Sequence, residues 1–150
     1  MNLSITIIGH NEVEHLRELL PQLKWADEIV YVDCESHDGS LEVAREAGCH
    51  VFSRPNNTNL NVNKSYAMEQ ANGDWVFYVD PDERIPEFLV SEIEKVIQGT
   101  TNSAFKLNRR NHYFGNWLRH GSQYLDTQLR FFRKDSTHFL NQHVHEKIGS

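Results

Sequence analysis

The sequence has little of what would define a specialised class of protein. Only two of its residues are cysteines, Cys34 and Cys49, and they form no CxxC pair. We therefore expect free thiols in a reducing compartment and not a disulfide framework. No basic and then apolar leader opens the chain, and no apolar run is long enough to cross a bilayer. A cytoplasmic protein is the expectation from these absences.

Size and composition are those of one ordinary globular domain. The chain has 150 residues, of which 39% are hydrophobic and 24% charged. A chain of this length buries roughly two thirds of the surface that its unfolded form exposes, so it can build a core without a structural metal. We predict a single domain over residues 1–150.

Positive charge is scarce in the first two thirds of the chain. Residues 1–100 carry 7 Lys and Arg against 18 Asp and Glu, a balance of −11, whereas residues 101–150 carry 8 against 3, a balance of +5. A nucleic-acid-binding protein would not be this acidic. The basic last third suits a smaller anion such as a phosphate, a nucleotide or a lipid headgroup, and the alternative is a solvated basic surface.

Strand and helix signals alternate through the first eighty residues. The hydrophobic pattern predicts strands at 3–8, 29–32, 51–52 and 75–79 and helices at 13–23, 41–47, 62–71 and 86–98, with Asn11 as a cap for the first helix. Repeated β-α-β units predict an α/β fold, a parallel sheet with helices on both faces. Further strands at 104–107, 113–117 and 129–132 predict a mixed, partly antiparallel C-terminal part.

Ligands of an open parallel sheet bind beyond the carboxyl ends of its strands. That rule selects residues 9–12, 33–38 and 80–82. Asp80 and Asp82 leave a buried strand at i and i+2, and they can converge on one side if the chain stays extended, which Pro81 favours. Two carboxylates there suit Mg²⁺ or Mn²⁺ bridging to a substrate phosphate. The alternative is a solvated acidic turn.

Other candidate residues also have two interpretations. Asp33 could accept a hydrogen bond from a nucleotide or serve the turn that follows it. Lys64 could be a ligand or a solvated lysine. Asp126, a rare acid in the basic third, could be a general base or a salt-bridge partner. His143 and His145 alternate, so on a strand they share a face and offer one metal or phosphate contact.

These residues stand within a longer series of stretches that match a known family in order. The stretches are residues 7–12, 25–30, 33–40, 73–76, 80–84, 109–111, 114–115, 119–121, 128–133 and 143–146. Together they resemble the family-two glycosyltransferases, which are inverting nucleotide-sugar enzymes with the GT-A fold. The branch that looks most similar makes bacterial lipopolysaccharide core and related surface glycans.

The resemblance implies a role for each matching residue. Asp126 matches the base that activates the acceptor, with Glu146 as the alternative. The metal would be held by Asp80, Asp82 and His145, with Asp82 the nearer to the cation. Donor-binding positions are Asn11, Glu12, Asp33, Lys64, Asp80 and Arg130, and Arg133 lies where the family places arginines near phosphates or acceptor.

The resemblance implies a metal-dependent inverting transfer of a hexose, with Mg²⁺ or Mn²⁺, from a UDP-sugar to a glycan or lipid-linked acceptor. Residues 1–100 would bind the donor, and residues 101–150 would begin a truncated acceptor half, because family members commonly continue further. The inner membrane face is an alternative location. Pro81 and Ser65 depart from the family's usual alanine and asparagine. The alternatives are a non-catalytic nucleotide-sugar-binding module and a nucleotidyltransferase. The loop 9–12 argues against the nucleotidyltransferase, because it is neither glycine-rich nor basic.

Overall fold

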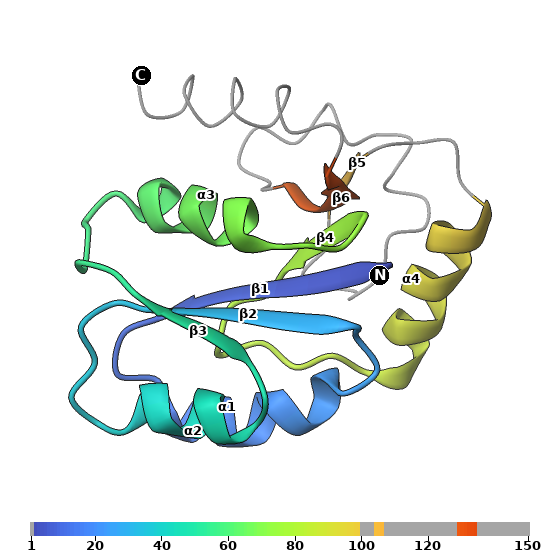
Figure 1. Cartoon of the computed structure of the whole chain (residues 1–150). Coiled ribbons are helices and arrows are strands. Elements are labelled where there is room, and N and C mark those ends of the chain that lie inside the picture. The colour runs from blue at the N-terminus through green and yellow to red at the C-terminus, as the bar shows by residue number, and fades with distance from the viewer. Residues whose placement is uncertain (1, 100–103, 107–128, 135–150) are drawn as a thin grey trace.

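One mixed sheet organises the molecule (Figure 1). The structure is a computed structural model that describes residues 2–99, 104–106 and 129–134. The strand order is β3-β2-β1-β4-β6-β5. β3, β2, β1 and β4 run parallel, and β6 is antiparallel to both β4 and β5. The strands are β1 Leu3–Gly9, β2 Glu28–Asp33, β3 His50–Ser53, β4 Trp75–Tyr78, β5 Ala104–Lys106 and β6 Leu129–Arg133. The predicted parallel sheet and antiparallel addition are confirmed, and the strand predicted at 113–117 lies outside the described residues.

Helices cover both faces of the sheet, as the sequence pattern predicts. The α-helices are α1 Val13–Leu19, α2 Ser40–Glu46, α3 Leu60–Gln70 and α4 Glu87–Gly99. Figure 1 shows α3 on one face and α1 and α2 on the other. The first predicted helix ends early, because its last turn is the 3₁₀ helix η1 (Leu20–Leu23) with Pro21 near its start. Proline cannot donate the i→i−4 hydrogen bond that would continue α1.

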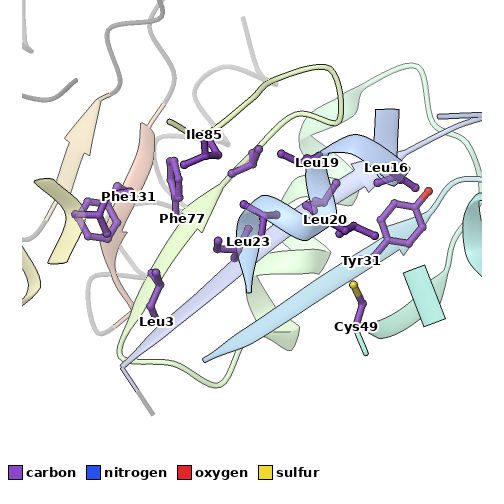
Figure 2. Packing of buried hydrophobic residues seen from close by; sticks show 14 of the residues in the cluster. Leu3, Leu16, Leu19, Leu20, Leu23, Tyr31, Cys49, Phe77, Ile85 and Phe131 are labelled. Atoms are coloured by element: carbon purple, nitrogen blue, oxygen red, sulfur yellow. The ribbon is translucent and has the colours of Figure 1, made fainter. Parts of the chain in front are cut away.

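Strand alternation divides the apolar side chains between two layers. Leu3, Ile5 and Ile7 of β1 join the main core, which includes Phe77 and packs against α1, η1 and α4 (Figure 2). Ile8 points to the other face and packs under α3. β1 is central and buried along its whole length, as expected for a parallel strand covered on both sides, and its two polar side chains, Ser4 and Thr6, are buried as well.

Both cysteines are free and buried, which confirms the expectation of unpaired thiols. Burial raises the pKa of the Cys49 thiol to about 11, so Cys49 stays protonated and packs as a small apolar side chain. In the described ranges, no helix has both the length and the hydropathy needed to span a membrane.

A buried carboxylate ties the strands together at their amino ends. Glu28, which begins β2 and is 5% exposed, accepts hydrogen bonds from the Ser4 hydroxyl at 2.5 Å and the Asn72 backbone N–H at 2.8 Å. The Asn72 side-chain amide and His50 Nδ1 lie 2.7 and 2.8 Å from its other oxygen. Burial alone would raise the pKa of Glu28, but these hydrogen bonds outweigh it and hold that pKa below 4.5. We call these four residues the Glu28 cluster.

The lowered pKa makes the Glu28 cluster acid-sensitive. A carboxylate whose pKa is lowered by folding stabilises the folded state above its unfolded pKa, and this contribution is lost as the pH falls through the folded pKa. We expect Glu28→Gln to lower the free energy of unfolding at neutral pH by about 1–3 kcal/mol. Urea unfolding measured as a function of pH should show that acidification lowers the free energy of unfolding less in the variant than in the parent. Glu94→Gln, at an exposed position of α4, is the control; an equal effect there would contradict the assignment.

Candidate functional site

Two loops at the carboxyl ends of β1 and β2 are joined by side chains. The backbone N–H of Val13, at the start of α1, donates to Asp38 Oδ2 at 3.0 Å. The N–H of Glu12 donates to the Ser40 hydroxyl at 3.0 Å, and that hydroxyl donates to Asp38 Oδ1 at 2.5 Å. Two N–H groups at the start of α1 are therefore satisfied by side chains from the loop after β2 and the first residue of α2.

Asn11 does not cap α1, so that prediction is wrong. Its backbone is left-handed, with φ of 54°. The Asn11 side-chain oxygen instead accepts a hydrogen bond from the His37 N–H at 2.7 Å, and the Asn11 N–H donates to the Ser36 hydroxyl at 2.8 Å. Asn11 thus holds the two loops together while Asp38 and Ser40 serve the helix.

Asp33 ends β2 and is buried. Its carboxylate accepts a hydrogen bond from the Tyr31 hydroxyl at 2.8 Å and from the Ser36 N–H at 3.0 Å. Burial and the Asp33 carboxylate both raise the pKa of Tyr31, so that hydroxyl remains a donor. These bonds fit the turn-forming interpretation of Asp33, and its predicted contact with a nucleotide stays a prediction.

The third loop, after β4, is a closed turn. The Glu83 N–H donates to the Asp80 carbonyl at 3.0 Å, and the Asp80 N–H donates to Glu83 Oε1 at 2.8 Å. Our expectation that the chain stays extended from Asp80 to Asp82 is therefore wrong. Pro81 occupies the second position of the turn, where its fixed φ is favourable.

Asp80 and Asp82 differ sharply in their surroundings. Asp80 accepts from the Tyr78 hydroxyl at 2.5 Å and from Arg130 at 3.1 Å, through different carboxylate oxygens. Asp82 is exposed, and its carboxylate has no hydrogen bond or ion pair with any residue in the described ranges. The turn therefore contains one carboxylate held in place and one that is accessible.

Two buried cations lie beside this turn. Lys64 of α3 places its Nζ 4.7 Å from the centre of the Tyr78 ring, and the Arg130 guanidinium lies 5.1 Å from the same centre. Burial and the Asp80 carboxylate raise the pKa of Tyr78. The Tyr78 hydroxyl is therefore neutral and donates to Asp80.

A pocket of about 330 Å³ lies where the three loops meet. Its lining comes from the ends of β1, β2 and β4 and from the segment leading into α3: Ile8, Gly9, His10, Glu12, Cys34, Asn56, Leu60, Tyr78, Asp80, Pro81 and Asp82. A larger groove of about 640 Å³ lies between η1 and α2. We favour the smaller pocket as the functional site because it holds carboxylates at the carboxyl edge of the sheet.

The sequence pattern of glycosyl transferase family 2 matches residues 4–150 of this chain. The chain belongs to glycosyl transferase family 2.

Family relatives and solved structures agree with this fold. The lipopolysaccharide core biosynthesis glycosyltransferase LpsC of Rhizobium meliloti is 28% identical over 152 residues, covering 97% of this chain and 56% of the relative. An uncharacterized glycosyltransferase of Rickettsia typhi is 27% identical over 143 residues, 93% of this chain and 49% of the relative. The mannosyltransferase PcManGT of Pyrobaculum calidifontis, solved with GDP-Man and Mn²⁺, superposes with a TM-score of 0.73 at 19% identity over 93% of this chain and 46% of that structure.

The family 2 chain spans about half the length, or less, of the relatives that it matches. At 19% identity, the structural likeness shows the fold, which is the GT-A fold that the resemblance predicts.

A divalent cation fits the exposed acid of this family 2 site. Mg²⁺ and Mn²⁺ prefer hard oxygen ligands, and Mg²⁺ commonly uses one or two carboxylates together with substrate phosphates. Asp82 offers such an oxygen at the pocket wall. Within the part of the chain that the structure describes, no cluster of three or more His, Cys, Asp or Glu side chains could hold a metal without a substrate. His145, the predicted third ligand, lies outside the described residues.

The structure brings some of the predicted residues of the family 2 site together. Glu12, Asp80 and Asp82 line the pocket, and Lys64 and Arg130 lie next to Tyr78 behind it. Arg133 lies over Trp75 instead. Asp126, Glu146 and His143 lie outside the described residues, and their roles stay predictions.

Sequence reasoning missed Glu83 and Tyr78. Glu83 stands in the matched stretch 80–84, but a glutamate directly before the basic residue Arg84 resembles an ordinary surface charge. Tyr78 was counted only as an apolar residue of β4. The signal that could have found it is period-2 spacing, since Tyr78 and Asp80 share one side of an extended strand end.

The shared cap of α1 can be tested directly. We expect Asp38→Ala to lower the free energy of unfolding by about 0.5–2 kcal/mol, the usual cost of removing a helix cap. Because Asp38 and Ser40 act through one hydrogen-bonded unit, Ser40→Ala in the same chain should add less than its effect alone. Urea unfolding of the double-mutant cycle gives the coupling. Full additivity would show that the two loops are not joined in this way.

Proposed function

We propose that this chain is a glycosyltransferase that binds a nucleotide-diphosphate sugar in the pocket at the carboxyl edge of its sheet. The observation that carries the proposal is the accessible Asp82 at the wall of that pocket, on a turn closed by internal hydrogen bonds. Family membership supplies the reaction class. The solved relatives with this fold include the Pyrobaculum mannosyltransferase with GDP-Man and Mn²⁺.

Different residues of the pocket would contact the diphosphate and the nucleoside of the donor. We place the diphosphate next to Asp82 and the nucleoside towards the loops after β1 and β2, where Glu12 and Asn56 line the wall. Lys64, behind Tyr78, adds positive potential on the side where the diphosphate carries its negative charge. We expect a UDP-hexose as donor and a glycan or lipid-linked acceptor, by analogy with the lipopolysaccharide core relative.

A divalent cation, Mg²⁺ or Mn²⁺, would be held by Asp82 together with the donor phosphates, and it supplies charge neutralisation of the leaving diphosphate. His145 is the further ligand that the family resemblance implies.

Inverting transfer requires a base on the acceptor side. We assign this role to Asp126, which takes the proton of an acceptor hydroxyl. The hydroxyl oxygen forms a bond to the anomeric carbon from the face opposite the nucleotide, and the bond from that carbon to the diphosphate oxygen breaks. The nucleoside diphosphate leaves with the bonding electron pair. We place this transfer on the cytoplasmic side, in solution or at the membrane surface.

Donor binding is tested by the response to nucleoside diphosphates. We expect UDP with Mn²⁺ to raise the melting temperature of this chain. Asp82→Asn should weaken UDP binding in the presence of Mn²⁺ at least tenfold, about 1.4 kcal/mol, with metal-free binding unchanged. Calorimetric titration with and without Mn²⁺ measures both quantities.

Asp74→Asn is the matched control, because Asp74 is an exposed aspartate at the opposite end of the same strand. Unchanged metal-dependent binding in Asp82→Asn would show that Asp82 is a solvated acid of the turn. No response to any nucleoside diphosphate with Mg²⁺ or Mn²⁺ would refute the donor site itself.

Transfer is tested separately at Asp126. Asp126→Asn keeps the size of the side chain but removes its basicity, so we expect transfer to fall about 10²–10⁴-fold. UDP–Mn²⁺ affinity should stay within roughly threefold of the parent, or ~0.65 kcal/mol. The measurement is UDP release from a UDP-sugar with acceptor present, beside calorimetric UDP binding, and Asp135→Asn is the control. A sharply lowered melting temperature would identify a salt-bridge residue, and binding without any turnover in the parent would identify a nucleotide-sugar-binding module.

A further inference from the structure

Arg130 is the most completely engaged charged residue of the site. It lies on β6, next to Tyr78 across the antiparallel pair with β4, and its side chain is 2% exposed. Its guanidinium donates to the Tyr78 carbonyl at 3.0 Å and to Glu83 at 2.7 and 2.9 Å. A further bond reaches Asp80 Oδ2 at 3.1 Å. A side chain bonded in this way supports the site from behind the pocket lining.

Glu83 is the centre of this arrangement. Both of its carboxylate oxygens accept from Arg130, and Oε1 also accepts from the Asp80 N–H. The pairing is bidentate, which fixes both distance and orientation. Burial alone would lower the pKa of Arg130, but Glu83 and Asp80 outweigh it and raise that pKa, so Arg130 is charged under all ordinary conditions.

The three acids of the turn differ in whether Arg130 neutralises their charge. Asp80 and Glu83 both pair with Arg130, and Asp80 also accepts from Tyr78. Like charges placed this close would otherwise repel each other and move the turn apart. With Arg130 in place, Asp82 is the acid of the turn left facing solvent.

We propose that Glu83 and Arg130 are positioning residues for the cation site: they fix the turn so that Asp82 faces the pocket, and neither contacts the cation or the donor. The inference rests on the proposed function. It changes the interpretation of Arg130, which the family resemblance places among the donor-binding residues.

A direct role of Arg130 as a phosphate ligand and an indirect role as a positioning residue predict different effects on UDP binding with and without metal. A phosphate ligand would contribute to UDP binding with or without metal, lysine would replace it in part as a point charge, and Glu83 would matter little. A positioning residue would affect only the metal-dependent part of binding. Arg130→Lys would then lose the metal-dependent part of UDP binding, because one ammonium group cannot reproduce the bidentate pair with Glu83 and the bond to Asp80.

The experiment compares Glu83→Gln, Arg130→Lys and the double variant with the parent chain. Calorimetry gives UDP affinity with and without Mn²⁺, and the electron paramagnetic resonance spectrum of Mn²⁺ reports its binding in the presence of UDP. We expect each single variant to reduce the Mn²⁺ enhancement of UDP affinity at least tenfold, about 1.4 kcal/mol. Metal-free affinity should stay within about threefold, and the double variant should be no worse than the more affected single variant.

Stability is followed by thermal unfolding, because Arg130 is buried. Glu83→Gln keeps the shape of the side chain, so it carries the test if Arg130→Lys is unstable. Arg17→Gln removes an exposed arginine from α1 and is the charge control. Loss of metal-free UDP affinity in Arg130→Lys, with Glu83→Gln unaffected, would overturn the proposal in favour of a phosphate ligand. An unchanged Mn²⁺ enhancement in Glu83→Gln would also overturn it, while a parent that binds no UDP with Mn²⁺ would refute the proposed function as well.

Discussion

Parallel pairing of β1 with both β2 and β4 is the constraint on which the pocket depends. The register places Gly9 opposite Asp33, so β1 and β2 end at the same level, and it places Thr6 opposite Tyr78, so β4 ends earlier and the chain continues through Asp80 beside the end of β1. Each chain segment must then leave the sheet at one edge, where no further strand pairing is available to its backbone. Side chains form the hydrogen bonds to that backbone instead. This explains why Asp, Asn and Ser are frequent in these loops, which lie outside the hydrophobic core.

The carboxylates at the two edges of the sheet are satisfied in different ways. At the amino edge, the Glu28 cluster closes on itself: one buried carboxylate is satisfied by donors from three parts of the chain. At the carboxyl edge, Asp80 and Glu83 are satisfied in the same manner by Arg130, but Asp82 is left accessible. A closed cluster contributes stability alone, whereas an exposed acid beside a pocket keeps its capacity for a ligand. The difference separates the edge that is built for stability from the edge at which we place the donor site.

Local sequence patterns predict the described strands and most of the described helices, because the apolar residues of each buried segment recur with the period of its own element. They were insufficient where the outcome depends on a distant residue. Pro81 is compatible with an extended Asp80 and also with the second position of a turn, and the choice between them involves Glu83 and Arg130, which are 47 residues apart. Likewise, an asparagine before a helix is a good cap by itself, yet α1 is capped by Asp38, 25 residues further along. The position of the candidate pocket agrees with the rule of strand ends, but the separate environments of Asp80 and Asp82 could not be predicted from it.

The position of β6 has a consequence for the order in which the domain is completed during synthesis. β6 covers the outer side of β4, and its Phe131 stacks on Trp75 with ring centres 4.7 Å apart. Until β6 has been synthesised, β4 is an edge strand of the sheet, with one side of its backbone unpaired and Trp75 without the stacked ring of Phe131. Such an edge can recruit strands from other nascent chains. The strand that covers β4 is the same one that brings the Arg130 guanidinium to the acidic turn, so protection of this edge and fixing of the turn come about in one step of synthesis.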